Sequence, residues 1–241
     1  MTGHDFANYW TQGFLGIEGW VDERLFEYLA LVDQVQQAAG VSGHVGEIGV
    51  FHGKLLIGLA HLARPGSKVT AIDVFDDQIR NIDGAGVGSL ARLEENVAAF
   101  GPDDVDYQFI KADSMALTNY DKIRLREERG PFRLFSVDGC HTLEHTLTDL
   151  LTAQDLLVPG GIIMLDDVFQ PHWPGVTEAI NILHERYVPR VRPFLYCCHK
   201  LFFVGHGWHS EFFTAVADQL AGRPNVRMTR MFHSNTVSVY P

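Results

Sequence analysis

The chain has 241 residues, of which 46% are hydrophobic, and a formal net charge of −11. This length suits one α/β domain with a substantial core. The acidic balance argues against a nucleic-acid partner, because such a partner requires a basic face on the protein.

The sequence also limits where the protein is expected to work. No apolar run reaches the roughly 18 residues of a membrane-spanning helix, so we expect no membrane partner. The N-terminal residues lack the cationic and apolar regions typical of a signal peptide. Three cysteines, Cys140, Cys197 and Cys198, cannot form a disulfide framework. We therefore expect a cytoplasmic protein in a reducing compartment.

The hydrophobic pattern alternates between strand-like and helix-like segments along the chain. Residues 17–39 predict an amphipathic helix, and another helix is expected between the fourth and fifth strands. The other predicted elements are, in order, a strand over 44–49, a helix over 53–63, a strand over 69–73, a helix over 89–100, strands over 107–113, 132–138 and 162–166, a helix over 175–187, strands over 192–197 and 200–205, a helix over 209–220 and a terminal strand or hairpin. This alternation predicts an α/β fold with a doubly wound, mostly parallel seven-stranded sheet and an antiparallel strand near the C-terminus.

A glycine-containing turn follows the first predicted strand, in the segment Gly46-Glu-Ile-Gly-Val-Phe-His-Gly53. Gly49 and Gly53 allow the backbone to approach a ligand closely, and the next helix presents its N-terminus there. The spacing differs from the dinucleotide fingerprint G-x-G-x-x-G, which disfavours a nicotinamide dehydrogenase. Glu47 would repel a pyrophosphate but would accept a ligand with an ammonium or sulfonium charge. S-adenosylmethionine carries both charges.

Acidic residues end the next two predicted strands. Asp73 lies about 20 residues beyond the glycine turn, where an acidic residue of such folds reaches ribose hydroxyls. Asp113 and Ser114 end the third strand, where they could meet an adenine. Each residue alone has an alternative role, because an acidic residue after a strand is often a helix cap. Their recurrence at successive strand ends favours a nucleoside-containing ligand.

Three further aspartates, Asp138, Asp166 and Asp167, end the fourth and fifth predicted strands. Parallel strands joined by a crossover helix place their carboxyl ends side by side, at the edge where α/β sheets bind ligands. Three crowded carboxylates are costly unless a cation lies between them. We therefore predict Mg²⁺, or another divalent cation that prefers oxygen ligands, at this position. The alternative is that Asp138 caps a helix while the other two simply end a strand.

The glycine turn and the acidic strand ends resemble those of the class I S-adenosylmethionine-dependent methyltransferases, which have a Rossmann-like fold. Glu47–Gly53 is similar to the first motif of that family, and Asp73 and Asp113 match its later acidic positions. The resemblance implies that S-adenosylmethionine binds to residues at the strand ends. These cofactor-binding candidates are Glu47, Gly49, Phe51, Gly53, Asp73, Asp113, Ser114 and Asp138.

A narrower resemblance points to the metal-dependent sugar O-methyltransferases of the macrocin and mycinamicin type. It rests on Asp138–His141, Pro159–Gly161 and the pair Asp166–Asp167, and the whole resemblance covers residues 44–205. The likeness implies methyl transfer to a hydroxyl of a sugar or another secondary metabolite. Many relatives have an acidic residue where this chain has Cys140, which leaves the identity of the general base open.

This resemblance assigns roles to the residues at the last two strand ends. Asp138, Asp166 and Asp167 would hold the metal ion, which would bind the acceptor oxygen and lower its pKa. Asp138 and His141 are the candidate catalytic residues, with His141 as general base because imidazole titrates near neutral pH. Alternatively, His141 caps a helix or hydrogen-bonds a metal ligand.

The remaining segments are expected to shape the site. We interpret residues 1–241 as a single methyltransferase domain with an N-terminal helical cap over 1–40 and a C-terminal extension over 206–241. The loop over 75–89 is predicted to be a substrate lid or, alternatively, a flexible surface loop. The helix over 17–39 could mediate homo-oligomer contacts, as in relatives, or cover the sheet. Tryptophans are candidates for a ring-stacking wall or for core packing: Trp10, Trp20, Trp173 and Trp208.

The leading hypothesis is therefore a divalent-metal-assisted O-methyltransferase for a small hydroxylated substrate. Two alternatives stay open at this point. One is a metal-independent methyltransferase for another small-molecule acceptor, and the other is a non-catalytic S-adenosylmethionine-binding module.

Overall fold

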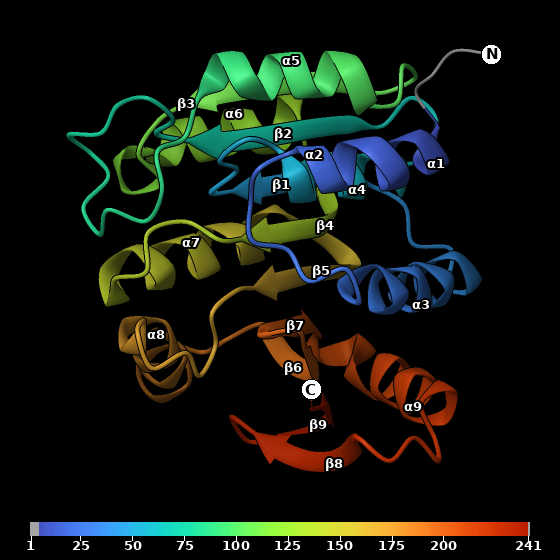
Figure 1. Cartoon of the computed structure of the whole chain (residues 1–241). Coiled ribbons are helices and arrows are strands. Elements are labelled where there is room, and N and C mark those ends of the chain that lie inside the picture. The colour runs from blue at the N-terminus through green and yellow to red at the C-terminus, as the bar shows by residue number, and fades with distance from the viewer. Residues whose placement is uncertain (1–4, 241) are drawn as a thin grey trace.

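Nine strands form one sheet in the computed structural model, which describes residues 5–240 (Figure 1). Their order across the sheet is β3-β2-β1-β4-β5-β7-β6-β9-β8. The strands are β1 His44–Ile48, β2 Lys68–Asp73, β3 Asp106–Lys111, β4 Phe132–Val137, β5 Leu157–Leu165, β6 Val191–Cys197, β7 Lys200–Gly205, β8 Val226–Met231 and β9 Ser234–Val239. The α/β fold is thus confirmed.

The first five strands run parallel to one another, whereas β7 is antiparallel to its neighbours β5 and β6. The predicted seven-stranded sheet with one antiparallel strand is wrong in detail. The chain's last two strands form an antiparallel hairpin, and β9 joins the sheet by pairing parallel to β6. This addition covers the edge of β6, whose backbone groups would otherwise lack a neighbouring strand.

Helices cover both faces of the sheet (Figure 1). Their bounds are α1 Phe6–Asn8, η1 Tyr9–Gly13, α2 Phe14–Gly16, α3 Leu25–Ala38, α4 Lys54–His61, α5 Leu90–Phe100, η2 Ser114–Ala116, α6 Asn119–Glu128, α7 Leu143–Leu156, α8 Pro174–Arg186, η3 His206–Trp208 and α9 His209–Gln219. One core contains Leu29, Leu56 and Phe212, from α3, α4 and α9. A second core contains Leu150 and Ile180, from α7 and α8, so the sheet is buried on both sides as doubly wound sheets are.

The N-terminal region differs from the predicted helix over 17–39. Helix α3 begins only at Leu25, and residues 17–24 form a non-helical segment that reaches the edge of the sheet. Gly19 has a φ of 151°, which favours glycine, and the side chain of Asp22 accepts a hydrogen bond from the backbone of Arg24 at 2.9 Å. These two local features hold the segment out of a helix, and they bring Trp20 towards the site described below.

Two helical segments have no counterpart in the sequence-based prediction. Residues 6–16 are helical, as is α6. Helix α6 is mostly polar, so it shows no apolar periodicity, but a capping box of Thr118 and Asp121 begins it. Among residues 5–240, no helix is long and apolar enough to cross a membrane.

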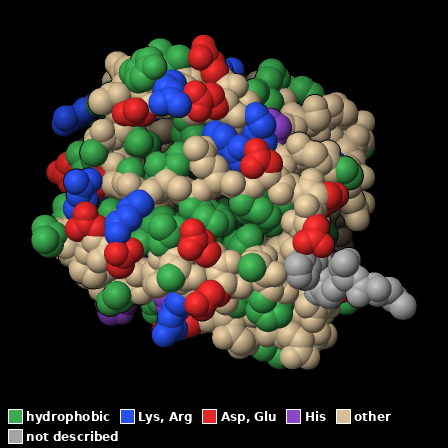
Figure 2. All heavy atoms as spheres, turned by 90° about the horizontal axis from the view of Figure 1, so that it is seen from above, with side chains coloured by type: hydrophobic (Ala, Val, Ile, Leu, Met, Phe, Trp, Pro, Cys, Tyr) green, Lys and Arg blue, Asp and Glu red, His purple; other side chains and the backbone are tan. Residues whose placement is uncertain are grey.

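Charged side chains of both signs are interspersed on the face of the molecule seen from above (Figure 2). Lysine and arginine side chains there stand close to aspartate and glutamate side chains. The described part of this face therefore shows no continuous patch of a single charge sign.

Candidate active site

A cavity of about 610 Å³ opens at the carboxyl ends of the parallel strands. Its position matches the general location of ligand sites in open α/β sheets. Ten of the residues proposed from the sequence line it: Glu47, Gly49, Phe51, Asp73, Asp113, Ser114, Asp138, His141, Asp166 and Asp167. The structure thus brings together the strand-end residues from five strands and the turns that follow them.

Gly49 lets the ends of two strands approach each other. It has a φ of 79°, and a Cβ built on it would lie 1.8 Å from the carbonyl oxygen of Asp138. No other residue type fits at this distance without moving the backbone. Gly53 has a related role outside the cavity lining: its φ is 86°, and a Cβ there would lie 2.4 Å from Leu93. Gly53 therefore allows α4 to begin close to α5.

Glu47 and Asp73 shape the end of the cavity formed by β1 and β2. Glu47 is buried, and its Oε2 has no hydrogen-bond partner among the described residues. Burial, reinforced by the negative charge of Asp138, raises the pKa of Glu47 well above its ordinary value. Asp73 accepts hydrogen bonds from the backbone nitrogens of Val50 and Phe51, at 2.6 and 2.9 Å. Asp73 thus holds the glycine turn in place as well as facing the cavity.

Asp113 and Ser114 lie at the end of β3, and Asp113 is also a cap. Its Oδ1 accepts a hydrogen bond from the backbone of Met115 at 2.9 Å. His145, at the start of α7, brings its Nε2 to 3.6 Å from the same oxygen. Ser114 is buried at the cavity wall. Both the ligand role and the capping role proposed for Asp113 are compatible with this geometry.

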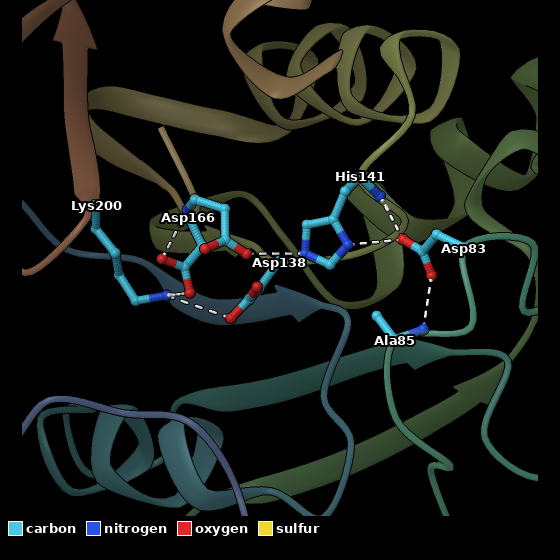
Figure 3. Close-up of polar contacts among 7 residues, drawn as sticks. Asp83, Ala85, Asp138, His141, Asp166 and Lys200 are labelled. Carbon is cyan, nitrogen blue, oxygen red and sulfur yellow. Dashed lines mark hydrogen bonds and ion pairs between the residues drawn. The ribbon is translucent and has the colours of Figure 1, made fainter. Parts of the chain in front are cut away.

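A lysine ammonium lies among the aspartates, and it comes from β7 rather than from a parallel strand (Figure 3). The Nζ of Lys200 lies 2.5 Å from Oδ2 of Asp166 and 3.3 Å from Oδ2 of Asp138. Only 3% of the Lys200 side chain is exposed. Burial disfavours its charge, but Asp138 and Asp166 outweigh burial and raise the pKa of Lys200 above its ordinary value.

The two carboxylates beside Lys200 ionise differently. Burial and the negative charge of Asp166 raise the pKa of Asp138 to about 8. Burial also acts against ionisation of Asp166, but Lys200 and the hydrogen bond from Asp138 outweigh it and lower the pKa of Asp166. Asp166 is therefore the carboxylate that ionises more readily beside Lys200, and Asp138 is the one whose charged form is disfavoured overall.

A second bridge of opposite charges has His141 at its centre, between two aspartates (Figure 3). Its Nδ1 lies 2.6 Å from Oδ2 of Asp83, which belongs to the loop over 75–89, and its Nε2 lies 2.9 Å from Oδ2 of Asp167. The backbone nitrogen of His141 also donates to Asp83, at 2.7 Å. Burial disfavours the imidazolium, but the hydrogen bonds that its ring nitrogens donate to Asp167 and Asp83 raise the pKa of His141 to about 9.

Aromatic side chains form part of the cavity wall. Trp173 stacks on His141 with ring centroids 4.2 Å apart, and Trp20 lies 5.1 Å from the ring of Phe51. Both tryptophans line the cavity, as proposed for a ring-stacking wall. Trp10 and Trp208 instead pack against the core of the α3, α4 and α9 face.

The loop over 75–89 borders the cavity along much of its length. Its lining residues are Phe75, Gln78, Arg80, Asn81, Asp83, Ala85, Gly86 and Gly88. Ile79 is 96% exposed, so the loop also presents apolar surface to solvent. Asp83 ties this loop to His141, which is the contact that a lid over the site would need.

Lys200 is the functional candidate that the sequence did not indicate. It follows Cys198 and His199, which form a two-residue turn with φ values of 50° and 62°. The available signal was the short spacing between the strands predicted over 192–197 and 200–205. A strand that runs antiparallel within the sheet begins at the edge where parallel strands end, so its first residue can enter the site.

Comparisons with known proteins identify the family and the fold of the chain. Residues 47–168 match a family described as a methyltransferase domain. No curated protein sequence matches the chain. Among solved structures, CalS11, a TDP-rhamnose 3′-O-methyltransferase of calicheamicin biosynthesis, is 20% identical, with a TM-score of 0.53 over 78% of this chain and 82% of that chain.

Two other solved structures share the fold. The O-methyltransferase NovP is 15% identical, with a TM-score of 0.55 over 76% of this chain and 79% of that chain. MycE, a methyltransferase of the mycinamycin pathway in complex with Mg and SAH, is 15% identical, with a TM-score of 0.50 over 83% of this chain and 52% of that chain. At these identities the likeness supports the fold of the chain.

Proposed function

We propose a small-molecule O-methyltransferase activity for this chain, which belongs to the methyltransferase-domain family and is an S-adenosylmethionine-dependent enzyme. The proposal of a hydroxyl acceptor rests on the chain of contacts from Asp83 through His141 to Asp167 in the wall of the cavity. An alkyl hydroxyl is a poor nucleophile until it loses its proton, and this bridge supplies a positioned proton acceptor beside Asp138.

The cofactor residues proposed from the sequence suit a cationic ligand. Glu47 is a buried carboxylic acid with an oxygen that lacks a partner among the described residues. The ammonium of S-adenosylmethionine would satisfy this oxygen and favour the ionised form of Glu47. Asp73, Asp113 and Ser114 line the same cavity, where they could meet the nucleoside, and Gly53 would act indirectly through the start of α4.

The need to remove the proton of the acceptor hydroxyl explains the roles proposed for His141 and its neighbours. Methyl transfer from a sulfonium is an in-line displacement, so the protein mainly aligns the acceptor and removes its proton. Asp83 orients the ring through Nδ1, which leaves Nε2 directed at Asp167 and the cavity. The ring accepts a proton only when it is neutral. We therefore expect the active form to increase as pH rises towards the pKa of about 9.

The class of acceptor follows from the walls of the cavity and from the similar structures. Trp20, Phe51 and Trp173 offer flat apolar surfaces beside the polar group around His141. Such a site suits a ring that carries a hydroxyl. CalS11 is described as a TDP-rhamnose 3′-O-methyltransferase, which makes a sugar the first acceptor class to examine.

Assistance by a divalent cation remains a prediction, and the residues as arranged do not fit it. Asp138, His141 and Asp167 can bring one ligand atom each within 4.8 Å of one another. Both nitrogens of His141, however, are hydrogen-bonded to carboxylates, and a metal ligand requires a neutral ring with a free nitrogen. The predicted set of Asp138, Asp166 and Asp167 contains the Lys200 ammonium instead. No step of the proposed reaction therefore depends on a metal ion.

The proposal is tested first by calorimetric titration of S-adenosylmethionine, with NAD⁺ as a negative control, and then by a screen of sugar and phenol acceptors for methylated product. His141→Asn should bind the cofactor normally but lose about 10²-fold or more in turnover. His172→Asn is the matched control, because His172 is exposed and does not line the cavity. Cofactor binding without any methylated product across the screen would contradict the proposed hydroxyl acceptor.

A further inference from the structure

We propose that Lys200 is a built-in cation of this site: its ammonium takes the place that the three-aspartate pattern predicts for a divalent ion, so methyl transfer requires no bound metal. This inference rests on the proposed methyltransferase function and concerns how that function handles the charge of its aspartates. It starts from the position that the sheet gives to Lys200.

The register of the sheet places Lys200 opposite Asp166. Strands β5 and β7 pair antiparallel with Leu165 opposite Leu201, so the next residues outward are Asp166 and Lys200. The turn of Cys198 and His199 ends immediately before Lys200. The lysine is therefore held at the carboxyl edge by the hydrogen bonding of the sheet itself, and a flexible side chain on a surface loop would not be held in this way.

The ammonium already bridges the oxygens that an ion would need. Nζ lies 2.5 Å from Oδ2 of Asp166 and 3.3 Å from Oδ2 of Asp138. Mg²⁺ binds carboxylate oxygens at about 2.0–2.1 Å, so an ion shared by these two oxygens would lie where Nζ lies. A dication placed beside the ammonium would also be repelled by it. Lys200 and a bridging metal ion therefore exclude each other at this position.

The burial of Lys200 indicates that its pairing with Asp138 and Asp166 is part of the folded core of the site. Lysine is almost never fully buried unless it is paired, and only 3% of this side chain is exposed. Its two acidic partners directly follow two neighbouring strands, β4 and β5, so the ammonium also links the strand ends. Removing the charge would leave Asp138 and Asp166 facing each other without compensation.

The same ammonium has a donor available for the acceptor. An ammonium has three N–H groups, and Asp138 and Asp166 account for two of them within residues 5–240. Lys200 also lines the cavity. The remaining N–H could donate to the acceptor oxygen as its negative charge develops, which is the contribution that a metal ion would otherwise make.

The test measures binding of Mn²⁺, which prefers oxygen ligands as Mg²⁺ does and is detected directly by paramagnetic resonance. The wild-type protein should show no saturable Mn²⁺ site that depends on Asp166. Lys200→Met removes the charge and retains most of the side-chain volume, so it should gain a saturable Mn²⁺ site that is about tenfold or more tighter than the weak, Asp166-independent binding of wild type. Adding Asp166→Asn to Lys200→Met should remove the new site.

Lys54→Met provides the matched control, because Lys54 lines the same cavity but contacts the Phe14 ring and the carbonyl of Gly19. This change should leave Mn²⁺ binding as in wild type. Saturable Mn²⁺ binding by wild type that Asp166→Asn abolishes would overturn the proposal. A folded Lys200→Met protein that gains no Mn²⁺ site would also overturn it.

Two precautions separate the possible failures. If Lys200→Met does not fold, the comparison of wild type with Asp166→Asn still decides whether a metal ion binds at this position. S-adenosylmethionine titration of the same samples tests the proposed function independently, because the cofactor can bind whether or not a metal ion binds beside Lys200. If wild type does not bind the cofactor, the proposed function is refuted, whatever the Mn²⁺ result.

Discussion

Two bridges of opposite charges lie side by side in the cavity, and they are built in different ways. Lys200 joins Asp138 and Asp166 from a strand whose register in the sheet fixes its position. His141 joins Asp167 to Asp83, which comes from the long loop over 75–89. The first, the sheet-built bridge, is permanently charged and held by backbone pairing. The second, the loop-built bridge, can lose its proton and can open when the loop moves.

This difference suggests a division of labour within the site. A fixed ammonium can compensate the aspartates without changing during a reaction, whereas His141 can lose its proton as pH rises through about 9. Changes that weaken the sheet-built bridge should therefore act mainly on stability. Changes at the loop-built bridge should act mainly on the pH at which the site works.

The largest loss of stability is expected at Gly49, where the ends of β1 and β4 meet. Gly49→Ala places a Cβ 1.8 Å from the carbonyl oxygen of Asp138, at a φ of 79°. The strand ends must move apart, so the free energy of unfolding should fall by about 4 kcal/mol or more. Urea unfolding measures this loss. Gly66→Ala is the control, because its φ is 75° but its Cβ meets nothing within 4 Å. Similar losses in both variants would show that backbone strain alone is responsible.

Breaking the sheet-built bridge is expected to have the next largest effect. Asp166→Asn leaves the buried Lys200 ammonium without its ionised partner, which should lower the free energy of unfolding by about 3 kcal/mol. Asp83→Asn at the loop-built bridge should cost only about 1.5 kcal/mol, because the loop can let water reach His141. Equal losses in the two variants, measured by urea unfolding at pH 7, would contradict the distinction between the bridges. S-adenosylmethionine affinity should stay near that of wild type in Asp166→Asn.

The loop-built bridge should make stability depend on pH. The pKa of His141 is raised to about 9 in the folded protein, against about 6.5 for a free imidazole. Its stabilising contribution is therefore complete below about pH 6.5 and is lost as pH rises through about 9, by about 3 kcal/mol. Urea unfolding between pH 6 and pH 9.5 measures this slope.

Asp138 contributes in the same direction, because its pKa is also raised, to about 8. Asp83→Asn separates the two contributions, since it should lower the pKa of His141 and leave that of Asp138 unchanged. The slope above pH 7 should then become shallower than in wild type. An unchanged slope in Asp83→Asn would assign the whole dependence to Asp138.

The sequence predicted the parallel part of the site well, because parallel strand ends meet at one edge wherever a βαβ pattern is present. Asp138, Asp166 and Asp167 were placed together by this rule, and Asp73 was added from its distance to the glycine turn. The contribution of Lys200 was not predictable in the same way. It depends on β7 lying antiparallel beside β5 in a particular register, and the hydrophobic pattern does not specify which strands pair.

Other elements were missed for comparable physical reasons. Helix α6 is too polar to show an apolar period, and residues 17–24 resemble a helix until Gly19 takes a conformation that favours glycine. The contact of Asp83 with His141 crosses a separation of 58 residues, so no local pattern could show it. The roles proposed for these residues in binding and catalysis stay predictions.

The smallest expected effect concerns the ring that stacks on the loop-built bridge. Trp173 lies 4.2 Å from the ring of His141, with an angle of 16° between the planes. Its face stabilises the imidazolium, so Trp173→Leu should lower the pKa of His141 by about half a unit, which corresponds to a contact of less than 1 kcal/mol. NMR titration of the histidine resonances measures this pKa without an acceptor. Trp20→Leu should leave it unchanged, because Trp20 packs on Phe51. A shift as large as that of Asp83→Asn would mean that stacking on Trp173, rather than the carboxylates, sets the protonation of His141.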